Sequence, residues 1–240
     1  SRVLERAHLG EPILGAAGCA GSTEDRLAEV RALQDAGQFN ESIEPLREVL
    51  ARNPDLAEAN YLLGVALVQT GQPSLAVWPL EKAIASDEYA VQAGLLLAST
   101  LSGNGAHEEA IRAASKVLAL EPGSVIALHT RGQAYLTAGQ PDLALADAET
   151  LLGINSEDHR AALLRGSALI DLDRADEAED IFKQLAQKAD ESGDVNDAVR
   201  KCAALATFYR SRKDTVRAKE TYASCIERYP THPLLQQWVA

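Results

Sequence analysis

The pattern that decides the fold lies in residues 57–88, AEANYLLGVALVQTGQPSLAVWPLEKAIASDE, and it recurs along the chain at a step of 34 residues. Four series of positions keep this step. They are Gly64, Ala98, Gly132 and Gly166; Gly37, Gly71, Gly105 and Gly139; Ser42, Ala76, Ala110, Ala144 and Ala178; and Leu33, Leu67, Leu101, Tyr135 and Leu169. Four series in one register indicate an internal repeat of about 34 residues, the period of a helix-turn-helix unit.

Each repeat predicts two helices, because apolar residues at helical spacing stand on both sides of the turn glycine. The composition agrees, since the chain is 46% hydrophobic and rich in Ala and Leu,. The repeats are predicted at residues 23–56, 57–90, 91–124, 125–158, 159–192 and 199–232, which together with their joints form an array over residues 23–230. Ala218 lies 40 residues after Ala178, so about six extra residues, near 193–198, precede the last repeat.

The two ends of the chain do not fit the repeat. Residues 233–240 begin a further helix, which either caps the array or is truncated. Residues 1–22 predict a flexible leader or a processed segment. Within them Ala16, Ala17 and Gly18 precede Cys19, which resembles the lipid-attachment site of bacterial lipoproteins, although Ala16 stands where such sites usually carry Leu,. A flexible Gly/Ala leader without lipid is the alternative.

The repeat pattern resembles the tetratricopeptide repeat family over residues 23–230. In that family small residues lie where the two helices of a unit cross, as Gly64 and Ala76 do in this register,. The frequent early tryptophan of the family is absent here, and the closing proline is missing after three repeats. The resemblance implies an all-α fold, a right-handed α-solenoid of about six helix-turn-helix repeats plus a C-terminal helix.

No pattern of catalytic residues is found in the sequence. The five histidines are scattered without a second ligand at i+3 or i+4, and no serine or cysteine stands in a nucleophile motif,. The net charge of -12 disfavours nucleic-acid binding, because an acidic surface repels phosphates,. We therefore expect a non-enzyme with no cofactor and no metal.

Cys202 and Cys225 fall on the two helices predicted for the last repeat, at similar distances from the turn near Lys213. Antiparallel helices place such positions opposite each other, so a disulfide between them fits an exported protein. The alternative is a pair of buried thiols in a reducing compartment.

The resemblance also implies that the first helix of each repeat lines a concave groove. Counting along these helices predicts a partner-binding groove made of Tyr61, Val65, Val68, Gln92, Leu95, Ser99, Ile126, His129, Gln133, Leu136, Arg160 and Ile170. For Leu95, packing between neighbouring first helices is an equal alternative. The mostly apolar lining favours a protein or peptide with an apolar or amphipathic segment. The Lys and Asn residues of a carboxylate clamp are not present at the matching positions.

These observations favour a non-catalytic scaffold for protein–protein interaction. One alternative is an exported repeat lipoprotein that assists assembly of a cell-envelope machine, similar to the pilotins of type IV pili or to lipoproteins of polysaccharide export. That protein would be attached to a bacterial membrane through Cys19 in the periplasm, whereas the chain without lipid is expected in the cytoplasm. Another alternative is self-association, since residues 199–240 carry eight basic and three acidic residues, a net charge of +5, on an acidic chain,.

Overall fold

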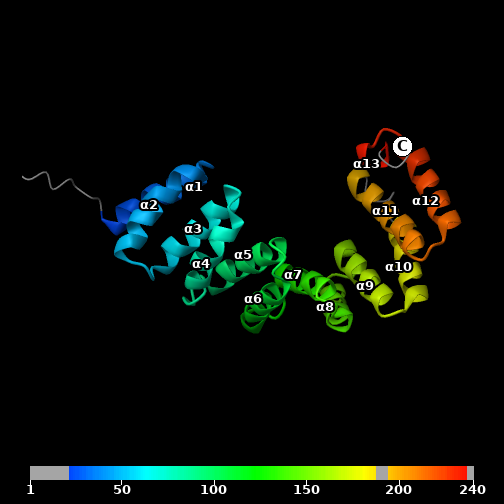
Figure 1. The fold of residues 1–240 in the computed structure, drawn as a ribbon, viewed down its shortest axis with the longest axis horizontal. Coiled ribbons are helices and arrows are strands. Elements are labelled where there is room, and N and C mark those ends of the chain that lie inside the picture. Colours follow the sequence, from blue (N-terminus) through cyan, green and yellow to red (C-terminus); the bar gives the residue numbers. More distant parts are fainter. Residues whose placement is uncertain (1–21, 188–193, 237–240) are drawn as a thin grey trace, which may run out of the picture.

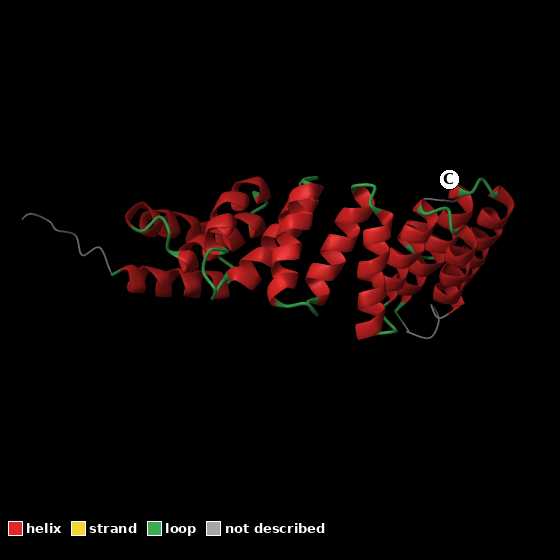
Figure 2. Cartoon of the chain, turned by 90° about the horizontal axis from the view of Figure 1, so that it is seen from below, coloured by secondary structure: helices red, strands yellow, loops and turns green. Residues whose placement is uncertain are grey.

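The computed structural model describes residues 22–187 and 194–236, and every regular element in these ranges is a helix. The helices run in order as α1 (Thr23–Asp35), α2 (Phe39–Arg52), α3 (Ala57–Gln69), α4 (Pro73–Ala83), α5 (Ala90–Gly103), α6 (His107–Leu120), α7 (Val125–Thr137), α8 (Pro141–Ile154), α9 (His159–Asp171), α10 (Ala175–Gln187), α11 (Val195–Ser211), α12 (Thr215–Arg228) and α13 (Pro233–Gln236). Consecutive helices pack as antiparallel pairs, and the pairs stack into an elongated array (Figures 1 and 2). The predicted all-α solenoid is confirmed.

The array curves, with the odd-numbered helices α3, α5, α7 and α9 toward the inside of the arc and α4, α6 and α8 toward the outside (Figure 1). Its core consists of successive clusters of buried apolar side chains, mostly Ala and Leu, that follow one another along the helix pairs. Each unit therefore buries its apolar stripe against its neighbours, as expected for a repeat protein. None of the described helices is both long and apolar enough to cross a membrane.

The turns inside the helix pairs explain the glycine series. Gly37, Gly71, Gly105 and Gly139 have φ angles of 75°, 74°, 80° and 70°, which side chains other than glycine rarely adopt,. The next two turns keep the geometry without glycine, because Asp173 has φ 58° and Lys213 has φ 61°. The turn therefore continues through all six pairs, while the glycine signal stops after the fourth.

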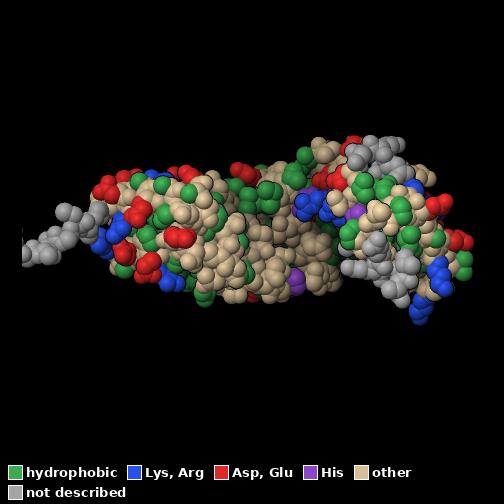
Figure 3. Space-filling view, turned by 90° about the horizontal axis from the view of Figure 1, so that it is seen from above, with side chains coloured by type: hydrophobic (Ala, Val, Ile, Leu, Met, Phe, Trp, Pro, Cys, Tyr) green, Lys and Arg blue, Asp and Glu red, His purple; other side chains and the backbone are tan. Residues whose placement is uncertain are grey.

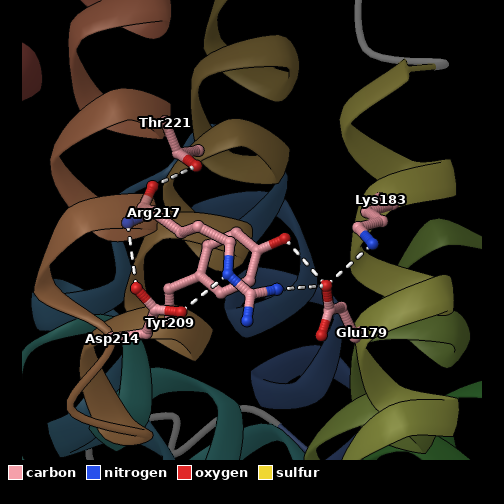
Figure 4. A network of polar contacts seen from close by, with 6 residues as sticks. All are labelled: Glu179, Lys183, Tyr209, Asp214, Arg217 and Thr221. Atoms are coloured by element: carbon pink, nitrogen blue, oxygen red, sulfur yellow. Dashed lines mark hydrogen bonds and ion pairs between the residues drawn. The ribbon is translucent and has the colours of Figure 1, made fainter.

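The last pair departs most from the array. Helix α11 has 17 residues, four more than α9. It starts at Val195, within the extra residues, near 193–198, that do not fit the 34-residue repeat. A polar network joins it to the fifth pair (Figure 4). In this network Glu179 of α10 accepts a hydrogen bond from Tyr209 of α11 at 3.1 Å and pairs with Arg217 of α12 at 2.9 Å and with Lys183 at 2.7 Å. The hydrogen bond from Lys183 lowers the pKa of Glu179 and outweighs the opposite effect of burial of the carboxyl group. The Glu179 side chain therefore stays negatively charged.

Cys202 of α11 and Cys225 of α12 are joined in the structure as a disulfide, with Cα atoms 6.3 Å apart and both residues buried. We expect unreduced protein, unfolded in guanidinium, to show no reactive thiol at these two positions in a thiol-titration assay. Reduction, or Cys225→Ser, is expected to lower the free energy of unfolding by about 3 kcal/mol, because the crosslink restricts the unfolded chain. Cys19→Ser is the control, with no change in stability. Two reactive thiols at Cys202 and Cys225 in the unreduced protein would contradict the pairing.

Candidate functional site

The inside of the arc is hollowed at its centre. The hollow has a volume of about 470 Å³ and is lined by residues of α5, α7 and α9 only. We call it the groove hollow, and its lining residues are Ser99, Ser102, Val125, Ile126, His129, Thr130, Gln133, Arg160, Leu163, Leu164 and Ser167. Three successive first helices thus form one shallow surface, open to solvent and large enough for a few side chains of a partner.

The chemistry of the groove hollow is apolar and polar without negative charge. Ile126 leaves 59% of its surface exposed there, beside the half-exposed Val125. Arg160 supplies a positive charge, and no Asp or Glu lies among the lining residues, although the chain has 35 acidic residues. Viewed from above in Figure 3, the middle of the array carries few acidic side chains, and a group of Lys and Arg side chains lies there with a few Asp or Glu side chains next to it.

His129 and Asp158 hold the base of α9 against α7 at the edge of the groove hollow. The Nε2 atom of His129 lies 2.9 Å from Oδ2 of Asp158, and the same carboxylate accepts hydrogen bonds from the amides of Arg160 and Ala161. Burial raises the pKa of Asp158, but these hydrogen bonds more than offset that effect, so the pKa lies below its usual value. The carboxylate therefore caps α9 and holds the backbone at its first turn, where Arg160 lies,.

The structure brings together five of the predicted groove residues and separates the others. Ser99, Ile126, His129, Gln133 and Arg160 line the groove hollow. The other seven lie outside it: Tyr61, Val65, Val68, Gln92, Leu95, Leu136 and Ile170. Five of these seven, Tyr61, Val68, Leu95, Leu136 and Ile170, are partly buried and pack on the apolar core.

Tyr61, which the sequence places at the centre of the groove, contacts another repeat. Its ring centroid lies 5.4 Å from that of Tyr89, in the segment that leads into α5. It is partly buried, so much of its ring stabilises the contact between the second and third repeats,. Ile126 is the better candidate for an anchor, because its side chain is exposed and lines the hollow.

A second hollow, of about 850 Å³, opens between α9 and α11, and we call it the α9–α11 cleft. Its charged residues were not predicted as site residues, with the exception of Arg160, because the cleft depends on how far the last pair is displaced. The extra residues before α11 are the only sequence signal for it. Among the described residues, no group of three His, Cys, Asp or Glu side chains is arranged to hold a metal ion.

Family comparisons agree with this architecture. Profiles of the tetratricopeptide repeat family match residues 27–93 and residues 204–232, and a profile described as subunit 3 of the anaphase-promoting complex, cyclosome, matches residues 103–185. The chain is a tetratricopeptide repeat protein. Proteins of this family bind protein partners, and the repeat serves as an interaction scaffold.

Solved structures similar to this tetratricopeptide repeat protein share its fold. One is a tetratricopeptide repeat protein from Parabacteroides merdae, with 19% identity, a TM-score of 0.73, and coverage of 85% of this chain and 79% of that one. A crystal structure of MamA has 24% identity, a TM-score of 0.65 and coverage of 71% and 93%. PilF of Pseudomonas aeruginosa has 20% identity, a TM-score of 0.58 and coverage of 90% and 96%. The comparison with curated protein sequences finds no match.

Proposed function

We propose that this chain is a non-catalytic scaffold that binds a segment of a partner protein in the groove hollow. The observation that carries the proposal is Ile126, an apolar side chain that is 59% exposed in a hollow formed by three successive helices. Surface apolar groups gathered in a concavity are typical of binding sites. Ser99, His129 and Gln133 surround it with hydrogen-bonding groups that can satisfy the backbone of an extended or helical peptide.

The test is a capture experiment from the native source with purified arrays that differ at one exposed apolar residue. We expect Ile126→Ser to recover at least tenfold less of a specific partner than the wild type, because a central apolar anchor contributes strongly to binding. Leu143→Ser is the matched control, since Leu143 is 47% exposed on α8, the outer helix of the same pair. Equal recovery by all three proteins would exclude the groove hollow as the binding surface.

The disulfide favours an exported form of this scaffold as a second candidate, because disulfides persist in oxidising compartments,. Assistance to a cell-envelope machine, and lipid attachment at Cys19, belong to this candidate. Cys19 lies outside the described residues. Mass spectrometry of the protein isolated from its native membrane fraction tests the lipid, which would add a diacylglyceryl mass to a peptide that begins at Cys19.

A further inference from the structure

The step from the fifth to the sixth repeat differs from the earlier steps. Residues of α7 and α9 share the groove hollow, whereas residues of α9 and α11 line the larger α9–α11 cleft. A polar contact between Nε2 of His159 and Oδ1 of Asp197, at 3.2 Å, bridges the two helices at one end. The α9–α11 cleft is thus bounded by a specific contact between two helices, and it lies beside the concave surface of the array.

Four carboxylates line the α9–α11 cleft, those of Glu157, Asp158, Asp194 and Asp197, and the three aspartates are already engaged. Asp158 caps α9, and Asp194 caps α11 by accepting hydrogen bonds from the amides of Asn196 and Asp197. Asp197 pairs with Lys201 at 2.6 Å as well as with His159, and the Lys201 side chain is only 8% exposed. These three acidic groups therefore stabilise the helices around the cleft and have little capacity left for a positively charged ligand.

The arginines of the cleft have no such partners. Across the described ranges no salt bridge is found for Arg160, Arg165 or Arg200, and the Nε atom of Arg165 is buried without a hydrogen-bond acceptor. The Nε atom of Arg200 donates only to a backbone oxygen of its own helix. Arg165 interacts electrostatically with Glu177 of α10. Three guanidinium groups without a salt bridge of 4.0 Å or less to any described residue thus line one cleft of a chain whose net charge is -12. An anionic group would supply the missing acceptors.

The cleft and the groove hollow adjoin each other at α9. Arg160 and Leu163 of α9 line both of them, so one ligand can extend from Ile126 into the cleft. The floor of the cleft is apolar, with Leu163, Ile181 and Leu185. Among the described residues no Phe, Tyr or Trp side chain lines it, so this part of the chain offers no large stacking platform of the kind that single-stranded nucleic acids use,. A peptide fits this combination of apolar floor and guanidinium groups better than a nucleic acid does.

We propose that the α9–α11 cleft binds an acidic amphipathic segment of the partner protein. Its carboxylates pair with Arg160, Arg165 and Arg200, while its apolar side chains lie on Leu163 and, farther along the groove, on Ile126. This proposal rests on the proposed function, because it names the chemistry of the segment that the groove receives. The acidic surface of the repeats before α11 repels such a segment, which disfavours its binding there,.

The test uses three labelled 16-residue peptides with the same leucines at helical spacing and with Glu, Gln or Lys at the remaining positions. In fluorescence anisotropy at low salt, we expect the Glu peptide to bind at least tenfold more tightly than the Gln peptide and the Lys peptide to bind most weakly. The double variant Arg160→Gln/Arg200→Gln is expected to lose the preference for Glu. The matched control is Arg47→Gln/Arg112→Gln, which removes the same charge from exposed positions on α2 and α6 and should keep the preference.

Each other outcome overturns the proposal in a recognisable way. Equal binding of the Glu and Gln peptides, still weakened by Ile126→Ser, leaves the groove as a binding surface and removes the acidic specificity. Binding of none of the three peptides contradicts the assignment of the cleft, and the capture experiment then decides separately whether the groove hollow functions. Displacement of the Glu peptide by a twelve-residue oligothymidylate at equimolar concentration would assign the arginines to nucleic acid instead.

Discussion

Replacement of Gly132 by leucine is expected to lower the free energy of unfolding by about 3 kcal/mol, because it overpacks the centre of the array. A Cβ atom on Gly132 would lie 2.5 Å from Cδ2 of Leu164 in α9 and 3.4 Å from Cβ of Asp147 in α8. The first distance is too short for any contact and the second leaves no spare room, and leucine adds three further carbons in the same place. The gain in helix propensity, about 1 kcal/mol relative to glycine, does not offset this strain.

The measurement is thermal and urea unfolding, followed by circular dichroism. For a chain of this size, 3 kcal/mol corresponds to a fall in melting temperature of about 6–12 °C. Gly153→Leu is the matched control, because Gly153 lies in the neighbouring helix α8 with no atom within 4 Å of the added Cβ. It should leave the stability unchanged or slightly raised. A melting temperature of Gly132→Leu within one degree of the wild type would refute the register of the repeat.

The sequence predicts the fold well, since the 34-residue step places both a turn and a crossing in every repeat. Gly64 and Gly166 illustrate the crossing, because an added Cβ would come within 2.4 Å of Leu80 and 2.8 Å of Phe182 on the partner helix. The start of α11 is harder to predict. Hydrophobic periodicity marks the face of a helix that is buried, but it does not determine the separation of two repeats joined by an unmatched segment.

The candidate site is less predictable from the sequence than the fold. Family register selects the side of each first helix, and it finds Ile126, His129 and Gln133 in the groove hollow. It fails at Tyr61, because the ring that covers it belongs to Tyr89, in a connecting segment of the next repeat. The family register also does not identify the arginines of the α9–α11 cleft. Within the described ranges they lack salt bridges because the nearby aspartates cap helices or pair with other residues, which the register does not show. Contacts between repeats, which a one-dimensional pattern does not contain, decide these points.

Removal of the Asp147 carboxylate is expected to be nearly as costly as the leucine at Gly132. Asp147 of α8 is buried, and it accepts hydrogen bonds from Nε and Nη2 of Arg131 in α7 at 2.9 and 2.6 Å. Arg131 also donates to Ser115 of α6 at 3.2 Å, so the pair connects three helices. Its hydrogen bonds with Asp147 raise the pKa of Arg131, so the guanidinium stays charged. Asp147→Ala would leave that charge partly buried without a partner, at an expected cost of about 3 kcal/mol in urea unfolding.

A second Arg–carboxylate pair has the same bidentate geometry but lies at the surface. Comparing it with Arg131–Asp147 distinguishes the effect of burial on stability from the effect of the hydrogen bonds. Arg174 donates to both oxygens of Glu177 at 2.7 and 2.8 Å, but the side chains are 46% and 52% exposed. Glu177→Ala should therefore cost less than about 1 kcal/mol, because water replaces the lost partner. The double variant Arg131→Met/Asp147→Leu should recover most of the stability lost in Asp147→Ala, since it removes the buried charge together with its partner. Equal losses in Asp147→Ala and Glu177→Ala would show that geometry, rather than burial, sets the contribution of such pairs in this array.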